Sequence, residues 1–300
     1  MLDGPCFTQP LKRAPGGDYL AMGSVHEKLY LRSLPGMNNT VRHIRPYSAL
    51  CWMAREIEKH ARARNLTGSA AAAVFNAGLW KIDALMLWTS HGDGTRLPGY
   101  TKFDRAVANN DLAGITNRRT RLFSPANYQP SLVNGFGWLQ LDESLGIYVC
   151  SEAGRKLADA FESHLRKTLT SHQIRWLADP YQTVCGPTKL AALQPALTVA
   201  TTAEETKAFT SSFVRAQYAD DWAFGGPDRR ATLLLALRAI DALNGTADDQ
   251  AVTDLDHIRE AMLCGVTRAG AQLDVSIGTA RQQWHVMQLR ALQRLAMECL

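Results

Sequence analysis

The chain has 300 residues, of which 46% are hydrophobic and 20% are charged, so it can bury a core and is not disordered by composition. Its net charge of +5 is small beside that of dedicated nucleic-acid-binding domains. The longest apolar run, Ala70 to Trp88, is broken by Asn76, Lys81 and Asp83, which argues against a membrane-spanning helix. The N-terminus lacks the apolar core of a signal peptide, so we expect a cytoplasmic protein that makes no membrane contact.

The basic residues are unevenly spread along the chain. Residues 1–70 contain ten lysines and arginines against five acids, whereas residues 71–300 contain 23 of each. Any long-range attraction for anions should therefore originate in the first quarter of the chain.

The six cysteines lie far apart, and none of them forms a C-x-x-C pair. A structural zinc site needs closely spaced thiolates, and a disulfide scaffold needs several bridges in a short chain. We therefore expect reduced thiols that pack as small hydrophobic side chains, and we expect no metal and no cofactor.

Residues 1–23 are rich in proline and glycine and are predicted to form an extended arm. A helical domain is predicted to follow over 24–100, with its main helices at 47–64 and 69–89. The first of these helices is amphipathic. One side carries the apolar residues Ala49, Leu50, Trp52, Met53 and Ile57, and the other side carries Arg55, Glu58, Lys59 and Arg62.

Residues 101–170 are predicted to form a winged-helix-like domain. A helix is expected over 125–134, followed by two short β-prone runs, 138–141 and 147–150, that form a hairpin. Ser151 is expected to cap the next helix, at 152–167. This order of helix, hairpin and helix is typical of a winged helix.

Residues 171–300 are predicted to form a helical domain. Candidate helices lie at 174–178, 190–197, 204–218, 229–243, 254–267 and 279–300. The last one is still apolar at Leu300, so either it docks at the chain end or the natural protein continues. The fold class expected is mainly α, with a helical N-terminal domain, a winged-helix-like centre with one β-hairpin, and a helical C-terminal domain.

The most distinctive stretch runs from Leu34 to Tyr47 and is followed by Trp52. After a Pro-Gly turn it places Arg42 and Arg45 three residues apart at a predicted helix start. A guanidinium group donates paired hydrogen bonds, which suits phosphate but equally suits carboxylates and backbone carbonyls. Arginines at a helix N-terminus oppose the helix dipole, so we favour an internal or interface ion pair over a phosphate contact.

The same stretch resembles the opening of uncharacterised bacterial proteins associated with antiviral defence loci. In that family, a Pro-Gly turn and a Thr/Asn-rich run precede an arginine–tyrosine phrase and aromatic residues that end in tryptophan. This chain departs from the pattern by carrying Pro46 before Tyr47, and Ala49-Leu50-Cys51 where aromatic residues are usual. The resemblance implies a component of a defence complex and names no reaction.

The central segment resembles the second half of bacterial winged-helix domains. The resemblance is carried by Tyr128-x-x-Ser131-Leu132, by the hairpin and by Ser151-x-x-Gly154, because a Ser/Thr-x-x-Gly phrase opens the helix after the wing in that family. A DNA-binding winged helix would place the 125–134 helix in the major groove.

This predicted helix contains no lysine or arginine, so phosphate contacts would have to come from Arg118, Arg119 and Arg121. The predicted wing turn carries Asp142 and Glu143, which a phosphate backbone would repel. Winged helices also serve as protein-docking modules, and we favour that interpretation here.

The sequence contains no nucleotide-binding glycine loop and no zinc-protease or serine-hydrolase motif. Glu56 and His60, four residues apart, are expected to be a surface pair on a helix rather than metal ligands. The His91–Asp93 loop is explained as well by a polar turn. Acid clusters at 220–221, 248–249 and 254–256 are expected to serve helix ends.

Three functional hypotheses follow. The favoured one is a non-catalytic scaffold or adaptor subunit of a bacterial multiprotein complex in antiviral defence, with other protein subunits as partners and DNA or RNA as a further contact. The second is a sequence-independent DNA- or RNA-binding protein that uses Arg42, Arg45, Arg118, Arg119 and Arg121. The third is an enzyme whose site is assembled from scattered residues, with the His91–Asp93 loop as its candidate.

Overall fold

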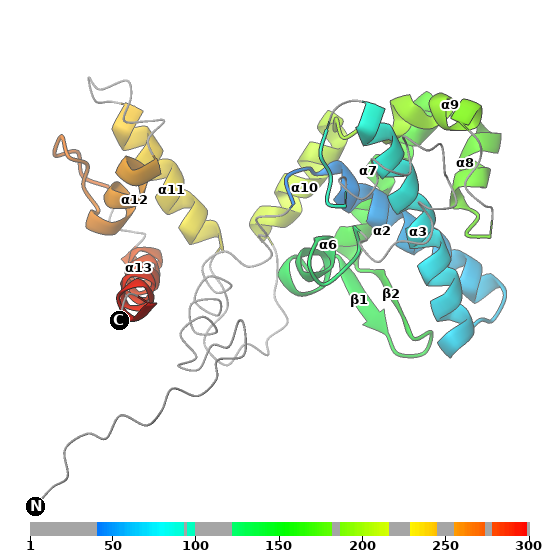
Figure 1. The fold of residues 1–300 in the computed structure, drawn as a ribbon, viewed down its shortest axis with the longest axis horizontal. Helices are drawn as coiled ribbons and strands as arrows, with labels where there is room; N and C mark the ends of the chain where they lie inside the picture. Colours follow the sequence, from blue (N-terminus) through cyan, green and yellow to red (C-terminus); the bar gives the residue numbers. More distant parts are fainter. Residues whose placement is uncertain are drawn as a thin grey trace, which may run out of the picture. The chain divides into compact units, whose positions relative to one another are not determined.

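Figure 1 shows a computed structural model of the chain, which is mainly α-helical with one two-stranded β-hairpin, as the sequence predicts. The chain divides into a central unit, Pro35–Gly226, and a terminal unit, which combines Met1–Leu34 with Pro227–Leu300. The structure describes residues 41–92, 95–99, 122–181, 187–215, 229–244, 255–273 and 278–298.

The central unit begins with helices α2 (Arg45–Ala63) and α3 (Gly68–Gly92), close to their predicted ranges. Leu50 and Ile57 of α2 are fully buried, as their spacing predicts. Gly78 of α3 allows the two helices to approach closely, because a Cβ atom there would lie 2.7 Å from Cδ1 of Ile57.

Within α3, the segment Gly68–Ser90 is long and apolar enough to cross a membrane. However, 67% of its most apolar stretch of 18 residues is buried inside the fold. Two of the polar residues that interrupt it are buried with it. Lys81 donates from Nζ to the backbone carbonyl of Asp179 at 3.0 Å, and Asp83 accepts a hydrogen bond from the backbone N–H of Leu122 at 3.1 Å. The segment is therefore packed as a core helix, which is compatible with a soluble protein.

The predicted hairpin is present as β1 (Leu139–Asp142) and β2 (Ile147–Cys150), which pair antiparallel with Leu139 opposite Cys150. The helix predicted over 125–134 is only partly right. The chain forms a three-residue α6 (Tyr128–Pro130) and then a π-helical turn, η1 (Ser131–Gly135). Pro130 has no backbone N–H to donate, which disfavours a regular α-helix through this segment.

After the hairpin comes helix α7 (Glu152–Thr168), and the side chain of Ser151 accepts a hydrogen bond from the backbone N–H of Gly154, as predicted. The backbone N–H of Ser151 donates to the Trp138 carbonyl at 2.9 Å, and a Cβ atom on Gly154 would overlap that same carbonyl oxygen. The Ser-x-x-Gly phrase therefore allows the start of α7 to lie directly against the chain that enters β1.

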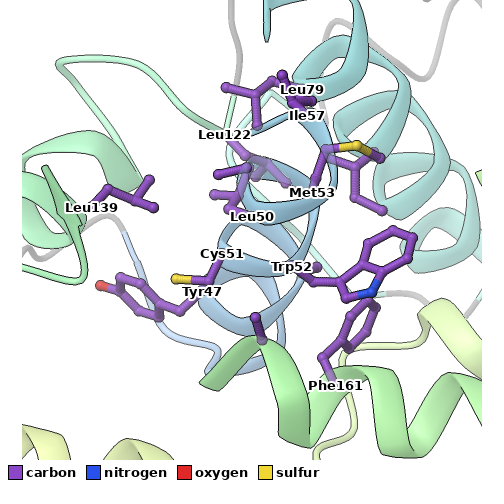
Figure 2. Close-up of a cluster of buried hydrophobic side chains, with 14 of the residues drawn as sticks. Tyr47, Leu50, Cys51, Trp52, Met53, Ile57, Leu79, Leu122, Leu139 and Phe161 are labelled. Atoms are coloured by element: carbon purple, nitrogen blue, oxygen red, sulfur yellow. The ribbon is translucent and has the colours of Figure 1, made fainter. Parts of the chain in front are cut away.

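The other described helices of the central unit are α8 (Ser171–Ala178), α9 (Pro187–Leu197) and α10 (Ala203–Arg215). The core of this unit is centred on α2, which packs most extensively against α7. Figure 2 shows Trp52 of α2 beside Phe161 of α7, with ring centroids 5.8 Å apart. The buried cluster includes residues from each of the predicted segments 24–100, 101–170 and 171–300.

The described helices of the terminal unit are α11 (Arg229–Asn244), α12 (Leu255–Cys264) and α13 (Gly278–Glu298). They share a smaller core that includes Leu235 and Met262. The chain turns after α12 at Gly265, whose φ of 70° favours glycine. A Cβ atom there would lie 2.5 Å from Nη1 of Arg281, whose Nε donates to the Leu263 carbonyl at 2.9 Å.

Candidate interaction surfaces

The two arginines at the start of α2 have different environments. Arg42 is exposed, whereas the Arg45 side chain is 1% exposed and its Nη2 lies 2.9 Å from Oε2 of Glu205 on α10. Arg45 also donates to the carbonyls of Ala196, at 2.9 Å, and Ala200. Of the two alternatives that the sequence left open, the structure shows the internal ion pair for Arg45, so its guanidinium is not presented to a phosphate.

Glu205 connects α10 to α2. Its Oε2 accepts hydrogen bonds from the backbone N–H and the hydroxyl of Thr202, at 3.0 and 3.2 Å, and the Thr202 hydroxyl in turn accepts from the Glu205 N–H. This is a capping box at the start of α10. The other carboxylate oxygen, Oε1, accepts from the hydroxyl of Ser48 at 2.5 Å. Sequence reasoning missed Glu205, although the spacing of Thr202 and Glu205 is readable as a capping box.

Tyr47, at the end of the arginine–tyrosine phrase, belongs to a buried aromatic cluster. Its ring centroid lies 4.7 Å from that of Tyr128 and 5.4 Å from that of Trp138. Burial raises the pKa of Tyr47 to about 12, and burial together with Tyr47 raises the pKa of Tyr128 further. Both phenols therefore stay neutral near pH 7. In the described residues, Tyr47 packs the start of α2 against Tyr128 and Trp138.

The helical segment before the hairpin does not present a reading surface for DNA. Asn127, Tyr128 and Ser131, which a groove-binding helix would expose, are buried. Arg118, Arg119 and Arg121 lie outside the described residues. In the described residues, the segment that was expected to enter a groove therefore packs into the core of the central unit.

The turn of the hairpin is held against the rest of the central unit. Asp142 Oδ2 accepts a hydrogen bond from Arg62 Nη2 at 2.7 Å, and the Leu145 carbonyl accepts from the N–H of Gly68 at 3.1 Å. Hydrogen bonds from Ser144 and Leu145 are the main causes that lower the pKa of Asp142, which therefore stays ionised beside Arg62. The wing turn contacts the connection between α2 and α3.

Two of the charged residues on the polar side of α2, Arg55 and Glu58, are not exposed to solvent. Both are buried, because α7 lies along this side of α2. Arg55 pairs with Glu56, Asp159 and Glu162, and these carboxylates raise its pKa although burial lowers it. An amphipathic pattern marks these positions as polar but does not reveal that a second helix covers them with acids.

Groups with catalytic or metal-binding chemistry are sparse in the described residues, where no cluster of three or more histidine, cysteine or acidic side chains could hold a metal ion. Glu56 is paired with Arg55 and Lys59 rather than directed at a ligand. The side chains of the His91–Asp93 loop, and the acids at 220–221, 248–249 and 254, lie outside the described side chains, while Asp256 pairs with Arg259.

The expectation of buried cysteines is confirmed for Cys51 and Cys150 and is wrong for Cys264, which is exposed. The Cys150 thiol donates to the Cys51 carbonyl at 3.0 Å, and burial raises the pKa of Cys51. The Cys51 thiol therefore stays protonated at neutral pH and is a poor nucleophile.

Large apolar side chains are exposed mainly on the terminal unit. Among the described residues of the central unit, Leu141 and Tyr181 are more than half exposed, at 57% and 53%. The exposed large apolar residues of the terminal unit are Leu234, Leu237, Leu255, Val286, Leu289 and Leu292. The sequence pattern predicted helices at both α11 and α13 and did not predict that their apolar residues would be partly exposed.

Comparison with protein-family models, with curated proteins and with solved structures found no match to this chain.

Proposed function

We propose that the protein is a non-catalytic scaffold or adaptor subunit of a bacterial multiprotein complex, and that its partners are other protein subunits. The observation that supports this proposal is the set of exposed apolar residues on the terminal unit. It is reinforced by Arg45, which the sequence offered as an anion-binding residue and which forms an internal ion pair with Glu205.

The exposed face of α13 carries the main argument. Ala280 belongs to the core of the terminal unit and Met287 on the same side of α13 is buried, while Val286, Leu289 and Leu292 are 45–63% exposed on the other side of the helix. A helix that is apolar on all sides is normally buried, and exposed apolar patches rimmed by polar groups mark interaction sites. The outer face of α13 is therefore the surface on which we place the partner.

The chemistry of this helix defines the kind of partner. Between residues 280 and 292 the charged side chains are Arg281 and Arg290, and no acid occurs. A complementary surface is an apolar helix face with acidic residues at its rim, because opposite charges at a rim favour the correct partner. We place this complex in the cytoplasm, and we take antiviral defence as its setting from the resemblance of the 34–52 stretch.

The test is affinity capture of the tagged chain from its native cell after nuclease treatment, with quantitative mass spectrometry. Leu289→Glu introduces a charge on the proposed surface, and Leu141→Glu is a matched control because both leucines are 57% exposed. We expect a defined partner that is captured by the parent chain and by Leu141→Glu and is lost from Leu289→Glu.

Three results would contradict the proposal. One is an identical set of captured proteins from all three chains, which would mean that α13 takes no part in their recognition. Another is a purified Leu289→Glu monomer that unfolds at a markedly lower temperature than the parent monomer, since Leu289 would then be covered within its own chain. Turnover of any substrate by the isolated chain, abolished by a point mutation, would contradict the non-catalytic role.

A further inference from the structure

Tyr181 is an exposed aromatic residue in a fixed position. It follows α8, and its backbone N–H donates to Oδ1 of Asp179 at 3.0 Å across Pro180, which restricts the backbone of this turn. The carbonyl of Asp179 accepts a hydrogen bond from the buried Lys81. The turn is therefore anchored to the core, while the Tyr181 side chain remains half exposed.

Two side chains at the C-terminal end of α2 lie against the Tyr181 ring: His60 from the last turn and Arg64, the C-cap residue. The ring of His60 is 5.1 Å from it at an interplanar angle of 61°, and Cζ of Arg64 lies 5.3 Å from its centroid. The Nε2 atom of His60 is buried and has no hydrogen-bond partner in the structure. The end of α2 thus places a cation and a second aromatic ring beside an exposed tyrosine.

Arg64 differs from the other basic residues near this end of α2. Lys59 is paired with Glu56, and Arg62 is paired with Glu58 and Asp142. In the described part of the chain, Arg64 is exposed and makes no ion pair, and its contact is with the ring of Tyr181. Its charge is therefore available to an external anion.

An exposed tyrosine beside an unpaired arginine has a recognisable chemistry. Unpaired bases stack on aromatic rings whatever their sequence, and a guanidinium group donates paired hydrogen bonds to phosphate. A base that lies on the free part of the Tyr181 ring has its sugar–phosphate backbone at the ring edge, within the range of a flexible arginine side chain. The two groups together match one nucleotide unit.

We propose that Tyr181 and Arg64 form a contact site for single-stranded nucleic acid, in which a base stacks on Tyr181 and Arg64 pairs with the adjacent phosphate. The site uses none of the five arginines that the sequence singled out, and it does not depend on the α13 surface. An acidic peptide is the competing ligand. The basic last turn of α2 with two neighbouring rings favours the nucleic acid, because a carboxylate ligand has no use for a stacking surface.

The experiment is fluorescence anisotropy of labelled oligo-dT and oligo-rU with the full chain, over a series of salt concentrations. We expect Tyr181→Ala to weaken binding by about fivefold to 150-fold, the range for loss of one stacked base, and Tyr181→Phe to bind as the parent chain does. Arg64→Ala should weaken binding and make the slope of log K against log salt shallower by about 0.7. Arg166→Ala is the matched control, because this exposed arginine is paired with Glu162 and should bind unchanged.

The proposal is overturned if the parent chain binds neither oligonucleotide at low salt, or if Tyr181→Ala binds as tightly as the parent chain. It is also overturned if polyglutamate of equal charge competes as well as unlabelled oligo-dT, because the site would then recognise charge without bases. If Tyr181→Ala fails to fold, as judged by circular dichroism, the Arg64→Ala and Tyr181→Phe pair decides in its place. None of these outcomes affects partner capture through α13.

Discussion

The buried pair of Arg45 and Glu205 gives the sharpest prediction about what holds the central unit together. Glu205→Ala would leave the Arg45 guanidinium in a site where the arginine side chain is 1% exposed, with backbone carbonyls but no opposite charge. Removing one partner of a buried ion pair costs about 3–5 kcal/mol of unfolding free energy. The same change also removes the capping box of α10, which is part of that cost.

The measurement is urea unfolding followed by tryptophan fluorescence. Six of the seven tryptophans lie in the Pro35–Gly226 range, so the signal reports mainly on the central unit. With a urea dependence of about 3 kcal/mol per molar, the expected loss lowers the midpoint by about 1–2 M. The control is Glu204→Ala, which removes an exposed, solvent-screened pair with Lys167 and should shift the urea midpoint far less than Glu205→Ala does.

A double variant separates the ion pair from simple loss of packing. Arg45→Met combined with Glu205→Leu removes both charges, and we expect it to regain most of the stability that Glu205→Ala loses. If Glu205→Ala shifts the midpoint no more than Glu204→Ala does, the assignment of Arg45 to an internal structural role is refuted. Arg45 would then again be a candidate for an external anion.

Three further perturbations test the packing of the central unit. Gly154→Ala should destabilise the central unit by about 1–3 kcal/mol, because the new Cβ atom meets the Trp138 backbone. Gly78→Ala should cost less, since flexible side chains surround that site. Thermal unfolding of the two variants checks the difference. Arg55→Ala should cost about 1–3 kcal/mol in urea unfolding, against little change for the exposed Lys156→Ala. The pKa of Tyr47 is raised to about 12 from an unfolded value near 10. Its contribution to stability is therefore complete below pH 10 and is lost as the pH rises from 10 towards 12. Ultraviolet titration should show at least one phenol that ionises near pH 12, and Tyr47→Phe should remove that ionisation.

Local signals in the sequence predict those elements whose structure depends on neighbouring residues. The hairpin and the capped start of α7 follow from β-prone runs around a glycine-containing turn and from Ser151, and the structure confirms both. The apolar face of α2 is equally readable, because buried positions such as Leu50 and Ile57 recur at helical spacing. These signals act over fewer than about ten residues, so no knowledge of the tertiary fold is needed.

The parts that the sequence did not predict depend on contacts between distant residues. Arg55 meets Glu162 only because α7 covers α2, and Arg45 meets Glu205 only because α10 begins beside the start of α2. Helical periodicity places these charges on a polar side and cannot distinguish a solvent-facing side from one covered by another charged helix. The η1 turn is a different case, because Pro130, which has no backbone N–H to donate, is a local signal in the sequence against a regular α-helix through this segment.

The salt dependence of nucleic-acid binding distinguishes the five-arginine hypothesis from a local contact at Tyr181 and Arg64. Five arginine contacts to a single strand would give a slope of log K against log salt of about −3.5, whereas one contact gives about −0.7. Arg45 is already held by Glu205, so the other four arginines alone would give a slope of about −2.8, which is still clearly steeper than that of one contact. A measured slope near −3.5 that Arg64→Ala leaves unchanged would place the contacts elsewhere and would make Arg118, Arg119 and Arg121 the first residues to substitute. A slope near −0.7 that Arg64→Ala abolishes would instead show that most of the positive charge of this protein serves its own fold.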